Sequence, residues 1–166
     1  TVALETVYRA LGITTGSLVW TTPITFLATA NAAKVLGAHV DFVDIDKDTY
    51  NMCTLALEQK LDESAKLGAL PDLVVPVHLA GEPCDMERIH QLSKSYGFYV
   101  VEDASHAFGA THNNAPIGAD NRSVACVFSF HPVKMITTGE GGALLINDEM
   151  YYDKALKMRN LDFDNS

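Results

Sequence analysis

One lysine lies among small and polar residues between two apolar runs, in the stretch FSFHPVKMITTGEGG at residues 128–142. Lys134 has no acidic residue three or four positions away that would pair with it on a helix surface. A lysine buried between two strands loses its proton more readily, and its free amine can attack a carbonyl group to form a Schiff base. Alternatively, Lys134 points into water from an ordinary glycine-rich hairpin loop. The spacing alone leaves both interpretations open.

A carboxylate and an imidazole follow another apolar run, in the sequence VEDASHA at residues 101–107. Asp103 could be a buried carboxylate that keeps a heterocyclic nitrogen protonated, as the pyridine ring of pyridoxal 5'-phosphate (PLP) requires. His106 could then hydrogen-bond the phenolic oxygen of the same ring. The alternatives are a helix cap or a structural ion pair for Asp103, and a core histidine for His106.

A phosphate site needs backbone N–H groups at a helix N-terminus together with hydroxyl groups. The chain offers Thr1 and Val2 at the start of its first helix, and Ser129 five residues before the lysine. Phe26 could stack on a pyridine ring, or it could be an ordinary core residue. There is no Walker or GxGxxG motif, and the GEGG at 139–142 precedes no helix, so a nucleotide-binding α/β domain of those kinds is disfavoured.

Strands and helices alternate along the chain. Hydrophobic periodicity and capping residues predict helices over 2–11, 25–36, 54–67, 85–96 and 148–160, and strands over 18–21, 40–43, 73–77, 98–101, 124–128 and 143–146. This order predicts an α/β fold, a three-layer sandwich whose mostly parallel sheet is covered on both faces. Sites in such sheets form at the carboxyl ends of the strands. The polar residues expected along that edge are Thr21, Thr22, Asp44, His78, Glu102, Asp103, Ser105, His106, Ser129, His131 and Lys134.

The composition is that of one globular domain, with 166 residues, 48% hydrophobic and 20% charged. The net charge of −9 disfavours a general nucleic-acid surface, although it allows a local phosphate site. No apolar run is long enough to span a membrane, and no secretory signal precedes the first helix. Three widely spaced cysteines predict reduced thiols and a cytoplasmic location, and the histidine spacing predicts no metal site.

Five stretches resemble the DegT/DnrJ/EryC1/StrS family of PLP-dependent sugar aminotransferases, which have the aspartate aminotransferase fold (fold type I). They are TTPITFLATANAA (21–33), VDFVDIDKDTYN (40–51), PVHLAGEPCDM (76–86), VEDASHAFGA (101–110) and FSFHPVKMITTGEGG (128–142). The resemblance covers nearly the whole chain. Within the family, the first, fourth and fifth stretches are most similar to enzymes that aminate C4 of a UDP-linked 4-keto-6-deoxy-N-acetylhexosamine on the route to pseudaminic acid.

The resemblance implies a role for each candidate residue. Lys134 would hold PLP as a Schiff base and later move a proton between the cofactor and the substrate. Asp103 would pair with the pyridine nitrogen, His106 would contact the phenolic oxygen, and Phe26 would stack on the ring. The residues that would hold the phosphate are Thr1, Val2 (through its backbone) and Ser129.

The resemblance also implies the partners. L-Glutamate would donate the amino group and the nucleotide sugar would accept it, in a homodimer that binds neither nucleic acid nor membrane. A related branch of the family dehydrates sugars and has histidine in place of the lysine. Because this chain has Lys134, the resemblance favours transamination.

Members of the family are more than twice as long as this chain, and parts of the family pattern are missing at both ends. Thr1 stands where the family's helix-opening turn ends, and Leu161, Asp162 and Phe163 replace a Ser-His-Gly sequence. We therefore expect residues 1–166 to be a PLP-binding large domain without its N-terminal segment and C-terminal small domain, and to be poorly active alone. The alternative is a non-catalytic or regulatory fragment that binds a cofactor or partner without turnover.

Overall fold

The computed structural model describes residues 1–119 and 121–160, so the departures expected at residues 161–163 lie outside it. Its helices are α1 (Val2–Ala10), α2 (Ala28–Val35), α3 (Thr54–Leu67), α4 (Met86–Tyr96), α5 (Glu149–Arg159) and the 3₁₀ turn η1 (Leu79–Gly81). Its strands are β1 (Leu18–Thr21), β2 (His39–Phe42), β3 (Leu73–Val74), β4 (Tyr99–Asp103), β5 (Thr111–His112), β6 (Ala115–Pro116), β7 (Ala125–Ser129) and β8 (Gly142–Ile146).

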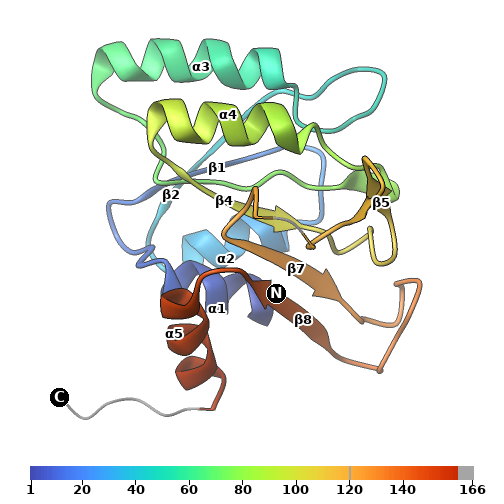
Figure 1. Ribbon diagram of the computed structural model, residues 1–166. Helices are drawn as coiled ribbons and strands as arrows, with labels where there is room; N and C mark the ends of the chain where they lie inside the picture. Colours follow the sequence, from blue (N-terminus) through green and yellow to red (C-terminus); the bar gives the residue numbers. More distant parts are fainter. Residues whose placement is uncertain (120, 161–166) are drawn as a thin grey trace, which may run out of the picture.

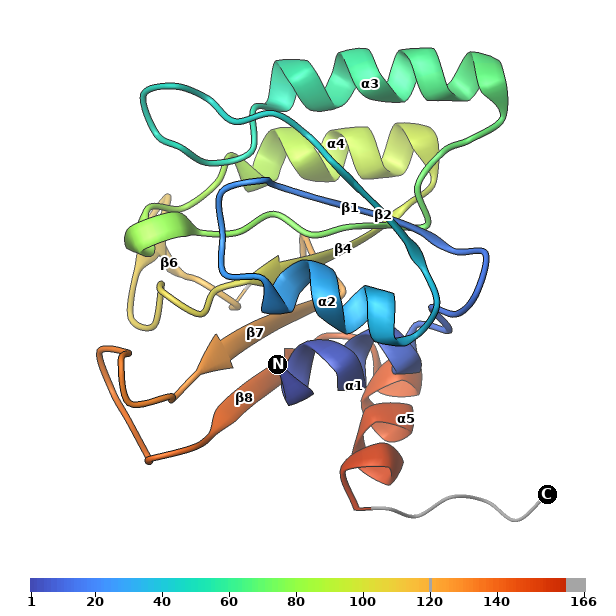
Figure 2. The ribbon, with the colours of Figure 1, turned by 180° about the vertical axis from the view of Figure 1, so that it is seen from behind.

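The central sheet has the strand order β2-β1-β3-β4-β7-β8. Neighbouring strands are parallel from β2 to β7, and β8 alone in this sheet runs antiparallel, against β7. Helices α3 and α4 cover one face, while α1, α2 and α5 lie on the other (Figures 1 and 2). The expected α/β sandwich with a mostly parallel sheet is confirmed.

Alternation along the strands divides the core into two halves. Val19 and Trp20 are neighbours on β1, yet Val19 packs into the cluster under α1 and α2, and Trp20 into the cluster under α3 and α4. Successive side chains of a strand point to opposite faces, so a strand buried on both faces is expected to be mostly apolar along its length. This explains why continuous apolar runs mark the central strands.

Several element boundaries differ from the predicted ones. Strand β3 ends at Val74 rather than at residue 77, because Pro76 has no N–H group to continue the ladder. The Pro76 carbonyl still accepts a hydrogen bond from the N–H of Asp103, at 2.9 Å. Strand β4 extends further than predicted, so that Asp103 is its last residue. Helix α2 begins at Ala28 rather than at residue 25, which leaves Phe26 in the bend before it.

The short hairpin of β5 and β6 was not predicted. Asn113 and Asn114 form its two-residue turn, and both have positive φ, at 50° and 64°. Asparagine tolerates this left-handed conformation, which two-residue hairpin turns require. The hairpin lies outside the main sheet and contributes none of the candidate site residues.

The core under α3 provides a test of the fold. Leu61 is 0% exposed, so Leu61→Ala is expected to lower the free energy of unfolding by about 2–5 kcal/mol through lost burial and a cavity. Leu67→Ala is the matched control in the same helix, because Leu67 is 80% exposed, and it should change stability by less than about 0.5 kcal/mol. Urea unfolding followed by circular dichroism measures both. Equal losses for the two variants would contradict the described packing of α3.

Candidate active site

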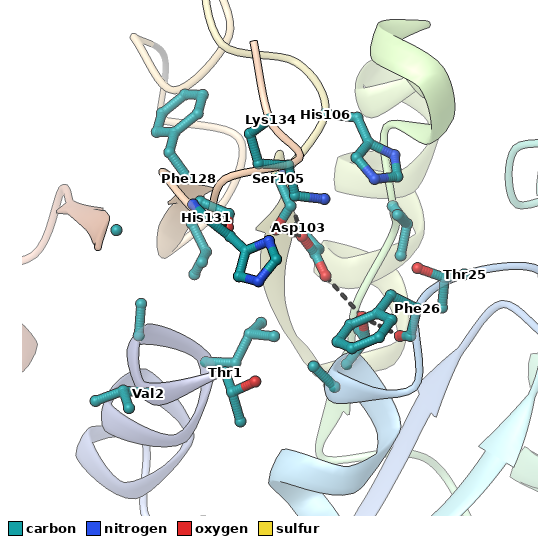
Figure 3. Close-up of a pocket in the computed structure, with 18 of the residues that line it drawn as sticks. Thr1, Val2, Thr25, Phe26, Asp103, Ser105, His106, Phe128, His131 and Lys134 are labelled. Atoms are coloured by element: carbon teal, nitrogen blue, oxygen red, sulfur yellow. Dashed lines mark hydrogen bonds between the residues drawn. The ribbon is translucent and has the colours of Figure 1, made fainter. Parts of the chain in front are cut away.

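A cavity of about 530 Å³ opens at the carboxyl ends of β4 and β7. Its walls come from the start of α1, the segment before α2, the end of β4 and the β7–β8 connection (Figure 3). This volume suits a small organic molecule. All seven candidate residues line it: Thr1, Val2, Phe26, Asp103, His106, Ser129 and Lys134.

Asp103 is buried at the floor of the cavity, with 4% of its surface exposed. Its Oδ2 accepts a hydrogen bond from the Thr29 hydroxyl at 2.6 Å, and its Oδ1 accepts from the Ser105 hydroxyl at 2.6 Å and the Ser105 N–H at 3.1 Å. A buried carboxylate is costly unless donors surround it. These neutral donors fix its orientation and leave its charge uncompensated, which suits pairing with a protonated group in the cavity.

Tyr8 supports this arrangement from beneath. Its buried phenol donates a hydrogen bond to the Thr29 carbonyl oxygen at 3.1 Å. Burial, and then the charge of Asp103, raise the pKa of Tyr8 well above its usual value. The phenol therefore stays protonated and donates to the Thr29 carbonyl oxygen. This hydrogen bond holds the first turn of α2, and the hydroxyl group of Thr29 in that turn donates to Asp103.

Lys134 lies on the connection between β7 and β8, and its side chain reaches the cavity. Its backbone N–H donates a hydrogen bond to the His131 carbonyl oxygen at 2.9 Å. The two ends of the connection are joined by a hydrogen bond from the Phe130 N–H to the Gly141 carbonyl oxygen at 2.8 Å. Lys134 is half-buried rather than fully buried, because the connection projects beyond the end of the sheet. The alternative interpretation placed Lys134 in a hairpin loop, and β7 and β8 do form an antiparallel hairpin. Lys134 nevertheless lines a cavity.

His106 faces Lys134 across the cavity mouth (Figure 3). Its Nδ1 is 3.3 Å from the backbone N–H of Ala80, which can only donate, so the ring proton of the neutral form lies on Nε2. Burial and then the positive charge of Lys134 lower the pKa of His106 below 6.5, while the negative charge of Asp103 opposes them. His106 is therefore a neutral donor at pH 7.

The start of α1 and the end of β7 supply the polar groups of the opposite wall. The first N–H groups of a helix have no partner within the helix, and the side chain of Thr1, the residue before α1, makes no capping hydrogen bond to them. The half-buried Ser129 ends β7 in the same cavity. Phe26 is 65% exposed, so it is not a core residue. Free N–H groups, a hydroxyl and an aromatic face together fit a phosphorylated ring.

The structure adds residues that the sequence did not single out. Thr29, the second residue of α2, was missed, although a threonine between alanines in TFLATANAA is a polar residue on an otherwise apolar face. His131 was expected at this edge without a role. It lines the cavity, and its Nε2 is 3.8 Å from Glu140 Oε1.

Five residues expected along the same edge do not line the cavity: Thr21, Thr22, Asp44, His78 and Glu102. Glu102 and His78 are both buried, and neither is among the residues that line the cavity. Glu102 immediately precedes Asp103 on β4, so the alternation of the strand sends its side chain to the other face. Both Glu102 and His78 lie near the carboxyl ends of their strands, as expected, but outside the cavity wall.

The chain matches the DegT/DnrJ/EryC1/StrS aminotransferase family over residues 1–166. It belongs to this family. It is 40% identical over 159 residues to the GDP-perosamine synthase of Escherichia coli O157:H7. It is 42% identical over 161 residues to the UDP-4-amino-4,6-dideoxy-N-acetyl-beta-L-altrosamine transaminase of Campylobacter jejuni. Each match covers 96% of this chain but only 42% and 41% of the relative, so the chain spans about two fifths of their length.

Solved structures of aminotransferases share the fold. Helicobacter pylori PseC, an aminotransferase of pseudaminic acid biosynthesis, superposes with a TM-score of 0.83 at 34% identity, over 95% of this chain and 40% of that one. A putative sugar aminotransferase of Streptococcus pneumoniae, solved in its PLP form, superposes with a TM-score of 0.76 at 30% identity, over 93% and 43% of the two chains. The fold type expected from the resemblance is confirmed.

No helix in residues 1–119 and 121–160 combines the length and apolar character needed to cross a membrane. No group of three or more histidine, cysteine, aspartate or glutamate side chains in this part of the chain could hold a metal ion.

The coupling between Lys134 and His106 is testable without any ligand. Lys134→Gln removes a positive charge that disfavours protonation of His106, so the pKa of His106 should rise and the ring should protonate at a higher pH. Lys134→Arg keeps the charge and is the matched control, which should leave that pKa close to the wild-type value. An NMR titration of the His106 ring measures both. An unchanged pKa in Lys134→Gln would show that the two side chains do not interact.

Proposed function

We propose that this chain is the PLP-binding large domain of a sugar-nucleotide aminotransferase. The enzyme would move the amino group of L-glutamate to C4 of a UDP-linked 4-keto-6-deoxy-N-acetylhexosamine, in the synthesis of pseudaminic acid or a related surface sugar. The observation that carries the proposal is the meeting of Lys134 and the buried Asp103 in one cavity. A nucleophilic amine and a fixed, uncompensated carboxylate are the two groups that PLP chemistry requires of its protein.

The residues of the cavity fit PLP group by group. Asp103 would accept a hydrogen bond from the protonated pyridine nitrogen, because its donors already fix both carboxylate oxygens in place. His106 would donate its Nε2–H to the phenolic oxygen, and the exposed ring of Phe26 would lie on a face of the cofactor. The free N–H groups at the start of α1 and the Ser129 hydroxyl would hold the phosphate.

PLP supplies an aldehyde that accepts amines and an electron-withdrawing ring that stabilises negative charge on the neighbouring carbon. Lys134 contributes an amine that binds the aldehyde and, once free, holds or moves a proton at its Nζ atom. Asp103 would place its carboxylate opposite the pyridine nitrogen. His106, neutral at pH 7, adds a hydrogen-bond donor without adding a second positive charge beside Lys134.

The proposed substrate and the proposed dimer are inferred from the relatives and from the family resemblance. Transfer to a UDP-linked sugar is supported by the altrosamine transaminase at 42% identity, while the GDP-perosamine synthase at 40% is the main competing indication. L-Glutamate as the amino donor and a homodimer follow from the family resemblance. Because the chain spans about two fifths of these relatives, the remaining three fifths would supply most contacts to the nucleotide.

Covalent labelling tests the proposed cofactor. The full-length protein is incubated with PLP and reduced with borohydride, which converts a reversible lysine–aldehyde link into a stable secondary amine, and the labelled peptide is mapped by mass spectrometry. Lys134 should carry the pyridoxyl group. Lys134→Arg keeps the charge but should leave residue 134 unlabelled and reduce transamination to background. Label spread over other lysines, with Lys134 unmodified, would refute the proposal.

Asp103→Asn tests the electrostatic role of the carboxylate. It removes the charge with little change in volume, so turnover of the full-length enzyme should fall by roughly 100-fold or more. Asp48→Asn is the control, because Asp48 is exposed and lies outside the cavity. A thermal melt shows whether each variant is folded. Turnover of Asp103→Asn within a few-fold of wild type would contradict the role. Cofactor binding by the wild type without turnover on any nucleotide sugar would instead support the regulatory alternative.

A further inference from the structure

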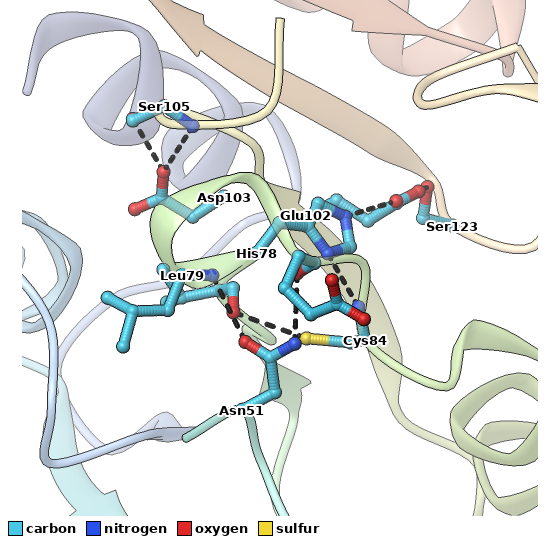
Figure 4. Close-up of polar contacts among 10 residues, drawn as sticks. Asn51, His78, Leu79, Cys84, Glu102, Asp103, Ser105 and Ser123 are labelled. Atoms are coloured by element: carbon cyan, nitrogen blue, oxygen red, sulfur yellow. Dashed lines mark hydrogen bonds and ion pairs between the residues drawn. The ribbon is translucent and has the colours of Figure 1, made fainter. Parts of the chain in front are cut away.

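Glu102 and His78 form a buried pair on the other side of β4 from the cavity (Figure 4). Their side chains are 3% and 0% exposed, and His78 Nε2 lies 2.8 Å from Glu102 Oε2. The other carboxylate oxygen of Glu102 accepts a hydrogen bond from the Ser123 hydroxyl. The proposed chemistry uses none of these three residues. A buried ionisable pair is costly to maintain, so its contribution must come from what it holds in place.

The partners of His78 determine where its proton lies. Its Nδ1 is 3.0 Å from the backbone N–H of Cys84, which can only donate, so Nδ1 is the acceptor. The proton therefore lies on Nε2, which donates to Glu102. The backbone N–H of His78 also donates to the carbonyl oxygen of Asp103, at 3.1 Å. His78 is thus attached to β4 through both its main chain and its side chain.

The residues fixed by His78 form the 3₁₀ turn η1, which begins at the next residue. Asn51 fastens this turn from the other side, because its Oδ1 accepts from the Leu79 N–H at 3.1 Å and its Nδ2 donates to the Glu82 carbonyl at 2.9 Å. Inside the turn Ala80 has a φ of 53°, a strained conformation for a residue with a Cβ atom. Such a conformation persists where the surrounding contacts hold it.

The turn η1 also contacts the site. The N–H of the strained Ala80 is the group that donates to Nδ1 of His106, at 3.3 Å. A Cβ atom added at Gly81 would lie 3.1 Å from the His106 carbonyl oxygen, so the turn lies directly against residue 106. A shift of the turn would therefore remove the hydrogen bond that selects the tautomer of His106.

We propose that the buried Glu102–His78 pair positions the turn η1, and that the turn thereby fixes the ring proton of His106 on Nε2, where it faces the cavity. Glu102 and His78 are positioning residues, since they act through Ala80 and are not among the residues that line the cavity. The significance of this tautomer for catalysis rests on the proposed function. The positioning itself does not, because it concerns the protein without cofactor.

Two substitutions of His78 that differ by one methylene group separate the loss of its link to Glu102 from the loss of the imidazole ring itself. In His78→Gln the amide can accept from the Cys84 N–H and still reach Glu102 as a donor, which copies the neutral imidazole. In His78→Asn the shorter side chain can accept from Cys84 but cannot reach Glu102. If His78→Asn does not fold because it leaves Glu102 unpaired, the double variant His78→Asn/Glu102→Gln breaks the same link without a buried charge.

The readout is the ring-proton position of His106 in the cofactor-free, full-length protein, from long-range proton–nitrogen NMR correlations assigned with His106→Gln. Wild type and His78→Gln should show the proton on Nε2. In His78→Asn or the double variant, the population with the proton on Nδ1 should rise by roughly fivefold or more, as expected for the loss of one hydrogen bond. A proton that stays on Nε2 in a folded link-breaking variant, or that moves in His78→Gln, would overturn the inference.

The NMR test of the positioning role can fail or succeed independently of the labelling test of the proposed function. If borohydride fails to label Lys134 while the link-breaking variants redistribute the His106 proton, the function is wrong and the positioning role stands. If Lys134 is labelled while the His106 proton stays on Nε2 in those variants, only the positioning role is wrong.

Discussion

The energetic cost of burying a carboxylate constrains this structure more than any other single requirement. Asp103 ends a parallel strand in the interior, where an ionised group is tolerated only when donors surround it. Thr29 from α2 and Ser105 from the loop after β4 supply those donors, and Tyr8 from α1 holds Thr29. Helices α1 and α2 and the loop after β4 are therefore arranged around one side chain. Moving any of them would leave this buried carboxylate without one of its donors.

Glu102, the residue before Asp103, is a second buried carboxylate, on the opposite face of the sheet. Its hydrogen-bond donors are a histidine and a serine, whereas Asp103 has two hydroxyl-bearing residues. Two adjacent carboxylates on one strand thus face two separate polar clusters, one open to the cavity and one closed. Since β4 carries both, a displacement of this strand would disturb both clusters together. The central position of β4 in the sheet, between β3 and β7, opposes such a displacement.

Most of the fold and the membership of the site followed from the sequence. Continuous apolar strands, capped helices and the rule that polar residues gather at the carboxyl ends of parallel strands were enough to bring Lys134 and Asp103 to one edge. The predicted strand ended at residue 101, so the alternation that sends the side chains of Glu102 and Asp103 to opposite faces of the sheet was not part of the prediction. Two boundaries that the prediction lacked do have sequence signals. Pro76 marks the end of β3, and Asn113 marks the hairpin turn.

Other features depend on tertiary structure alone. The partner of Thr29 lies 74 residues away along the chain, and no local pattern indicates such a contact. The half-buried position of Lys134 likewise depends on how far the β7–β8 connection extends beyond the sheet.

The antiparallel pairing of β8 with β7 makes the connection that carries Lys134 a local unit. Ser129 pairs directly with Gly142, so the segment that carries the lysine closes on itself within one hairpin. Closing a short loop has a small entropic cost, and its register does not depend on the distant crossovers of the parallel strands. In evolutionary terms, a substitution of the half-buried Lys134 would change the chemistry of the cavity without altering the register of the parallel strands.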